Sequence, residues 1–266
     1  MTGIRDSGFG IRGAETGTRG SGFGARVSGC SAAILSLALL TLTASLAGAA
    51  EPQTVTFTAR DGVQVSAVLH VPDKTPAPAV VLLSMLGRTH RDWDGAAAKF
   101  VEAGIAVLAV DFRQVALTDP DAAESASNRY AALVLDAEAA RAYLAARPEV
   151  NPSRIGMAGA SLGANVAVLA AANDPSVRSL ALLSVSLDYR GLKLEQALRK
   201  FASRPALLVA SSEDPFALRS ARQAVTMGDG ARELRVLSGA GHGSMMLARE
   251  PDLAAALVDW FLRTLL

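Results

Sequence analysis

The chain has 266 residues and a formal net charge of +1; half of its residues are hydrophobic and only 5% are aromatic. A net charge this close to zero does not suggest a nucleic-acid-binding surface, and so few aromatic residues disfavour a base-stacking platform. The length is compatible with a single large α/β domain. Because Cys30 is the only cysteine, residues 51–266 form no internal disulfide and depend on a large apolar core.

The first 31 residues differ in composition from the rest. They are rich in Gly, Arg and Ser, and the motif SGFG occurs twice. Such a segment buries too little apolar surface to offset its ordering entropy. We predict that residues 1–31 are disordered, or that the start codon was assigned too far upstream.

Residues 32–50 form an uncharged apolar run that ends in small residues. This pattern is typical of a secretory signal peptide. We expect cleavage near Ala49 or Ala50 and export to the periplasm or beyond. A retained membrane anchor is the alternative, because the run is nearly long enough to span a bilayer.

From residue 52 onward, short apolar runs alternate with helix-like segments. Two strand-like runs, 54–59 and 63–71, flank the turn signal Arg60-Asp61-Gly62 and predict a hairpin. Further strands are predicted at 79–84, 105–110, 155–158, 177–184, 206–210 and 234–237, and helices at 93–103, 128–146, 162–172, 193–201, 216–226 and 252–265. Fully apolar strands separated by helices are typical of a parallel sheet covered on both faces. We therefore predict one α/β domain over residues 51–266, with a mostly parallel sheet of about eight strands, helices on both faces and an N-terminal antiparallel hairpin.

The motif GASLG, residues 159–163, falls between a predicted strand and a predicted helix. On such a turn a serine is exposed as a nucleophile, and glycines two residues to either side avoid clashes. The N-terminus of the following helix favours a developing negative charge. A tight turn with Ser161 as a polar filler is the alternative, so other parts of the chain have to decide.

A candidate site is completed by two residues, each of which follows a later strand. Asp214 is either a helix N-cap or the acid of a catalytic triad, with Glu213 as its near competitor. His242 follows the last predicted strand in a glycine-rich loop. Of the other histidines, His70 lies within a predicted strand and is interpreted as structural, whereas His90 is a weaker candidate for the base.

Ser161, Asp214 and His242 each follow a strand, and open α/β sheets place their sites at the carboxyl ends of the strands. Their chain order, serine then acid then histidine, is the order expected of one fold. We predict a catalytic triad in which His242 takes the proton of Ser161 and Asp214 holds the imidazole tautomer. An acyl-enzyme intermediate follows from this chemistry.

On these residues, positions 54–266 resemble the α/β-hydrolase superfamily, and more narrowly its small, cap-less dienelactone-hydrolase-like and prolyl-oligopeptidase-like serine hydrolases. The resemblance rests on GASLG (159–163), SSEDPF (211–216) and GAGHG (239–243), and more weakly on Asp111-Phe112-Arg113, after which Gln114 replaces the usual glycine. It implies the α/β-hydrolase fold and a cofactor-free serine hydrolase.

The same resemblance implies an oxyanion hole made of backbone N–H groups. The donors are those of Leu162, the residue after the nucleophile, and of Leu86 or Met85 in the loop after the third strand. The family usually begins this loop with His-Gly, whereas this chain has Ser84 there. Because backbone donors survive side-chain changes, this departure does not exclude catalysis.

The sequence thus predicts a serine hydrolase that cleaves carboxylic esters of small molecules. About twenty residues separate the strands near 184 and 206, which leaves little room for a lid, so we expect an open, shallow pocket for small or exposed acyl groups. The alternatives are a peptidase or thioesterase with the same triad, or an inactive hydrolase-fold binding protein, which the altered loop favours.

The three histidines are scattered along the chain and do not have the spacing of metal ligands. We expect no cofactor, no metal and no nucleic-acid partner, and membrane contact only if the N-terminal apolar segment is retained.

Overall fold

The computed structural model describes residues 51–114 and 123–266. The predicted disordered segment and the predicted signal peptide, with its cleavage site, lie outside the described residues. Within those residues, no helix is both long enough and apolar enough to cross a membrane.

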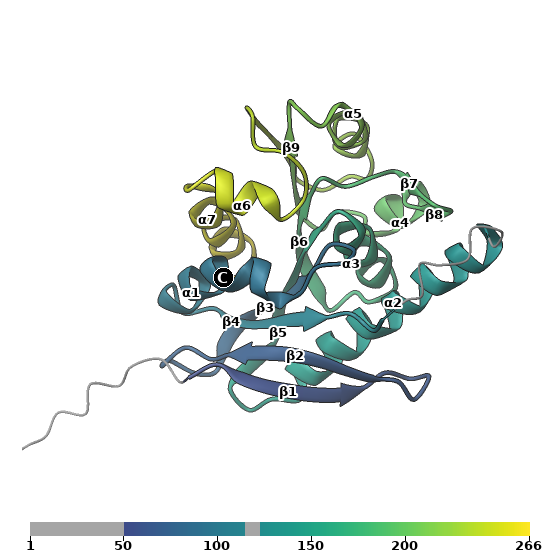
Figure 1. Cartoon of the computed structure of the whole chain (residues 1–266). Helices are drawn as coiled ribbons and strands as arrows, with labels where there is room; N and C mark the ends of the chain where they lie inside the picture. The colour runs from purple at the N-terminus through teal and green to yellow at the C-terminus, as the bar shows by residue number, and fades with distance from the viewer. Residues whose placement is uncertain (1–50, 115–122) are drawn as a thin grey trace, which may run out of the picture. The chain divides into compact units, whose positions relative to one another are not determined.

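The described residues form an eight-stranded sheet with the strand order β1-β2-β4-β3-β5-β6-β9-β10 (Figure 1). Its strands are β1 (Gln53–Thr58), β2 (Gln64–His70), β3 (Ala77–Leu83), β4 (Ala106–Asp111), β5 (Val150–Ala160), β6 (Val177–Leu183), β9 (Ala206–Ser211) and β10 (Arg232–Leu237). Strand β2 pairs antiparallel with β1 and with β4, and every other neighbouring pair is parallel. The predicted α/β-hydrolase architecture with its N-terminal hairpin is confirmed.

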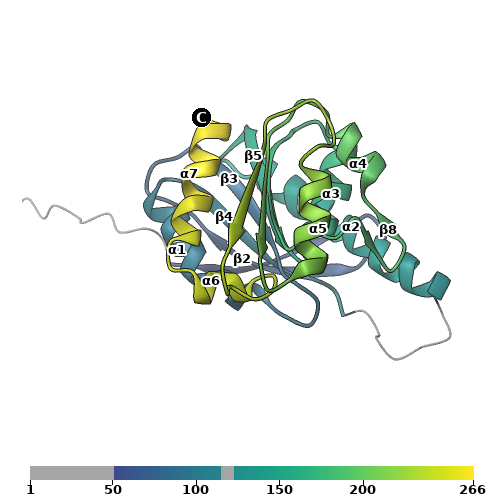
Figure 2. The same ribbon diagram turned by 90° about the horizontal axis from the view of Figure 1, so that it is seen from above.

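Helices cover both faces of this sheet. Figure 2 shows α1 and α7 on one face, and α2, α3, α4 and α5 on the other. Their bounds are α1 (Asp94–Glu102), α2 (Ala123–Ala145), α3 (Leu162–Asn173), α4 (Glu195–Lys200), α5 (Pro215–Ala224) and α7 (Leu253–Leu265); a 3-10 turn, η1 (His90–Trp93), precedes α1. A sheet covered in this way needs strands that are apolar on both sides.

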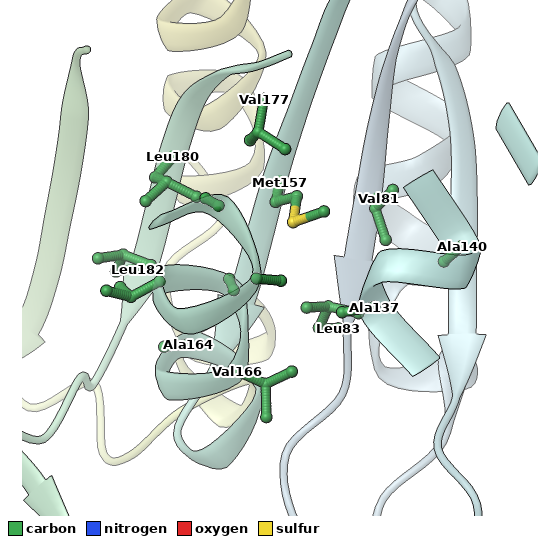
Figure 3. Close-up of a cluster of buried hydrophobic side chains, with 14 of the residues drawn as sticks. Val81, Leu83, Ala137, Ala140, Met157, Ala164, Val166, Val177, Leu180 and Leu182 are labelled. Atoms are coloured by element: carbon green, nitrogen blue, oxygen red, sulfur yellow. The ribbon is translucent and has the colours of Figure 1, made fainter. Parts of the chain in front are cut away.

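The side chains of β3 show how one strand serves two cores. Val80 and Leu82 pack with Trp93 and Phe100 on the face covered by α1 and α7. Val81 and the other alternate residues point into the core on the opposite face. Figure 3 shows Val81 and Leu83 in that second core, with alanines of α2 and with residues of α3, β5 and β6. The period-two alternation of a strand therefore distributes one apolar run between two layers.

Several short elements were not predicted. Strands β7 (Asp188–Tyr189) and β8 (Leu192–Lys193) form a small hairpin between β6 and α4, and α6 (Met245–Arg249) follows the loop that carries His242. Strand β5 begins at Val150, earlier than the predicted 155. Elements of two to five residues are too short to show a hydrophobic period.

Candidate active site

The three residues of the predicted triad lie at the carboxyl edge of neighbouring strands. Ser161 directly follows β5, Asp214 comes three residues after the end of β9, and His242 comes five residues after the end of β10. These strands, with β6 between β5 and β9, are consecutive in the sheet. The parallel arrangement therefore delivers all three loops to one edge.

The turn at Ser161 is strained. Its φ of 51° and ψ of −116° lie in a region that non-glycine residues rarely adopt. The chain is also tightly packed on both sides of the serine. A Cβ at Gly159 would lie 2.2 Å from the carbonyl oxygen of Gly163, and a Cβ at Gly163 would lie 2.4 Å from the carbonyl oxygen of Leu83. Only glycine fits at these two positions without moving the backbone.

The structure brings Ser161, His242 and Asp214 into one hydrogen-bonded series. His242 Nε2 lies 2.8 Å from Ser161 Oγ, and His242 Nδ1 lies 2.5 Å from Asp214 Oδ2. Because a carboxylate oxygen accepts hydrogen bonds, Nδ1 carries the imidazole proton. The lone pair of Nε2 then faces the Ser161 hydroxyl.

Asp214 combines the two roles that the sequence left as alternatives. Its Oδ1 accepts a hydrogen bond of 3.0 Å from the backbone N–H of Ala217 and so caps α5, while its Oδ2 faces His242. The cap fixes the carboxylate plane, which orients the second oxygen. The competitor Glu213 is exposed and faces Arg249 at 3.8 Å.

The other two histidines lie outside this series. His90 Nδ1 lies 2.7 Å from Asp111 Oδ2, and the His90 backbone N–H donates to Oδ1 of the same carboxylate. His70 pairs with Val107 at the amino end of β4, the edge opposite the triad. Burial lowers the pKa of the His70 imidazole below its ordinary value.

The three predicted oxyanion residues contribute to the lining of one small cavity. Met85, Leu86 and Leu162 line a space of about 150 Å³. Leu162 is the first residue of α3, so its N–H has no partner within the helix. Ser84, which replaces the usual histidine, is buried, and its hydroxyl donates to the carbonyl oxygen of Val110, 3.3 Å away. The loop after β3 is thereby attached to β4.

The guanidinium groups at this cavity are paired with carboxylates. Arg88 contacts Asp92 at 2.6 Å, and this pairing raises the pKa of Arg88 and lowers that of Asp92. Arg113 is paired with Asp61 and with the fully buried Asp136, and both carboxylates raise the pKa of Arg113. These pairs neutralise the positive charge at the cavity wall.

Sequence reasoning missed a set of serines that hold the His242 loop. Ser184 Oγ accepts a hydrogen bond of 2.9 Å from the N–H of Gly243, and Ser211 Oγ accepts one of 3.0 Å from the N–H of Ala240. Ser244 donates its hydroxyl proton to Asp92. For Ser184 and Ser211 a signal was present, because each directly follows an apolar run, 180–183 or 206–210.

The chain matches a known protein family. A family model described as the dienelactone hydrolase family matches residues 65–265, which include Ser161, Asp214 and His242. No curated protein matches the chain.

Three solved structures illustrate the fold. Dienelactone hydrolase from Anabaena variabilis is 20% identical with a TM-score of 0.64, covering 82% of this chain and 100% of that chain. Acetyl xylan esterase from Paenibacillus sp. R4 is 17% identical with a TM-score of 0.65, covering 80% and 83%. EstE1, a thermostable carboxylesterase from a metagenomic library, is 21% identical with a TM-score of 0.61, covering 81% and 90%. At these identities the likeness is one of fold.

Proposed function

This chain belongs to the dienelactone hydrolase family, and we propose that it is a serine hydrolase that cleaves carboxylic esters of small molecules through an acyl-enzyme. The family supports a hydrolase of the esterase type. The finer proposal is supported above all by the hydrogen-bonded series from Asp214 through His242 to Ser161.

The acylation step follows from the orientation of these groups. His242 Nε2 accepts the Ser161 hydroxyl proton as Oγ attacks the ester carbon, and a tetrahedral oxyanion forms. The N–H of Leu162 and that of Leu86 or Met85 stabilise this oxyanion, and a single such donor contributes roughly 3–4 kcal/mol. Asp214 stabilises the imidazolium through Nδ1. His242 then returns the proton to the leaving alkoxide, and the acyl group remains on Ser161.

Deacylation reverses these roles. Water takes the place of the alcohol, His242 Nε2 removes its proton, and the hydroxide attacks the acyl carbon. The second tetrahedral intermediate collapses when Ser161 Oγ leaves and receives the proton from His242. The His242 side chain is 43% exposed, so water can approach the imidazole from solvent.

The cavity lined by Leu162, the residue directly after Ser161, supports a small, uncharged acyl group. Its volume of about 150 Å³ lies well below the roughly 300–1,000 Å³ of pockets that enclose drug-sized ligands. Phe112 and Leu133 contribute apolar lining, and the nearby guanidinium groups are already paired. The leaving group lies on the His242 side, because His242 has to protonate it.

A fluorophosphonate probe tests the nucleophile. Wild type is expected to be labelled, and Ser161→Ala is not; equal labelling of both, or of neither, would overturn the assignment and favour an inactive binding protein. Substrate class is then measured with p-nitrophenyl esters of increasing chain length, acyl thioesters and aminoacyl amides. The proposal expects the highest kcat/KM for short-chain esters; a preference for thioesters or amides would replace the esterase with a thioesterase or a peptidase.

We also propose that the enzyme works outside the cytoplasm, because residues 32–50 have the pattern of a signal peptide. N-terminal sequencing of the protein produced in a secreting host tests this. A mature chain that begins at Ala50 or Glu51 supports export, whereas recovery of the uncleaved chain in membranes supports the anchor.

A further inference from the structure

Ser184 has an unusual backbone conformation for a buried serine. It follows β6, is 2% exposed and has a φ of 53°, in the left-handed region that favours glycine. A non-glycine residue persists there only where its surroundings enforce the conformation, and such residues cluster at functional sites.

Neighbouring elements hold Ser184 in place. Its N–H donates to the carbonyl oxygen of Val209 on β9, 2.8 Å away. Two residues later, Ser186 exchanges two hydrogen bonds with the fully buried Asn165, at 2.9 and 3.1 Å. Asn165 belongs to α3, the helix that begins directly after Ser161. The turn after β6 is thus fixed to the same helix as the nucleophile.

The hydroxyl of Ser184 is directed at the loop that carries the histidine. It accepts the N–H of Gly243, the residue directly after His242, at 2.9 Å. This part of the loop lies next to Met85 and the nucleophile, since a Cβ at Gly243 would lie 3.0 Å from Met85 Sδ and 3.5 Å from Ser161 Cβ. The hydrogen bond therefore fixes the backbone from which the imidazole projects.

The need for such support follows from the strand order. Strand β10, which delivers His242, is separated from β5 by β9 and β6. The loop has to cross the ends of both strands to reach Ser161. A buried serine meets it at each crossing, because Ser211 at the end of β9 accepts the N–H of Ala240 and Ser184 after β6 accepts that of Gly243.

We propose that Ser184 is a positioning residue for His242, and that its left-handed backbone is retained because it directs Oγ at the Gly243 N–H. Ser211 gives the same loop a second support before the histidine. The inference rests on the proposed function, since positioning His242 matters only if His242 activates Ser161.

Two substitutions separate positioning from a merely structural role. Ser184→Gly removes the hydroxyl and relieves the backbone strain, whereas Ser184→Ala removes the hydroxyl and keeps the strain. Ser184→Gly is therefore expected to have a higher Tm than Ser184→Ala by a few degrees. If Ser184 positions His242, both variants nevertheless lose kcat for p-nitrophenyl acetate by about ten- to a hundredfold with little change in KM.

Ala202→Gly is the matched control. Ala202 has a φ of 55° and lies after α4, outside the triad loops. Its substitution should raise Tm by a few degrees and leave kcat unchanged, which shows that strain relief alone does not lower activity.

The outcomes are distinct. Equal kcat losses in the two Ser184 variants, despite different Tm values, support the proposal. Activity that follows Tm, with Ser184→Gly close to wild type, overturns it while the proposed function stands. If wild type itself neither reacts with the fluorophosphonate nor hydrolyses the ester, the proposed function fails, and the positioning role with it.

Discussion

Gly163→Ala is the substitution whose consequence the structure defines most closely. The added Cβ would lie 2.4 Å from the carbonyl oxygen of Leu83 and 2.6 Å from that of Ser84, whereas real Cβ contacts essentially never fall below 3.0 Å. Both partners are backbone atoms, so no side chain can rotate away. The end of β3 and the start of α3 have to separate by at least about 0.6 Å, the difference between 3.0 and 2.4 Å.

This displacement falls on both halves of the proposed oxyanion hole. Leu162 begins α3, and Leu86 lies in the loop that Ser84 opens. A misplacement of about 1 Å at a reacting centre costs on the order of a hundredfold in rate. We expect kcat/KM to fall by about ten- to a hundredfold. Overpacking costs about 1–3 kcal/mol of unfolding free energy, or roughly 2–12 °C in Tm for a domain of this size.

Gly95→Ala is the control for a glycine substitution as such. Gly95 lies in the first turn of α1, and a Cβ there meets no atom of the described residues within 4 Å. Replacing a helical glycine with alanine is expected to stabilise the protein by about 0.5–1 kcal/mol without changing activity. Ester hydrolysis, fluorophosphonate labelling rate and thermal denaturation measure both variants. A Gly163→Ala protein with wild-type Tm and kcat/KM would refute the argument.

Three further predictions concern single side chains. Asp214→Asn keeps an N-cap for α5 but presents the wrong partner to His242, so kcat should fall about 10⁴-fold with little change in Tm; substantial activity would remove Asp214 from the triad. Arg113→Met leaves the fully buried Asp136 without its ion-pair partner, and chemical denaturation should show a loss of about 3–5 kcal/mol; an unchanged midpoint would contradict this. Burial lowers the pKa of His70, so as pH falls the imidazole of the unfolded chain is protonated before that of the folded chain. The free energy of unfolding should therefore decline below about pH 6.5. His70→Asn should flatten that decline, and the same slope in wild type and variant would contradict a contribution from His70.

Much of the fold followed from local pattern. Short apolar runs such as 79–83 and 105–110 are typical of strands buried on both faces, and the helix-like segments between them indicate a parallel sheet. Parallel strands place their carboxyl ends at one edge, which is why Ser161, Asp214 and His242 could be chosen together from their order in the chain. The short hairpin β7–β8 and helix α6 escaped notice because elements of two to five residues are too short to establish a repeating hydrophobic pattern.

The sequence by itself determined the order of strands and helices and the candidate residue that follows each strand, including the glycines around Ser161. These features could be recognised because they are patterns among residues that are close together in the chain. Only the tertiary structure decided how they meet. Three contacts join partners more than twenty residues apart in the chain: Asp214 with His242, His90 with Asp111, and Ser184 with Gly243. A hydrogen bond of this kind is set by how strands and helices pack, and its partners leave no periodic mark on the sequence.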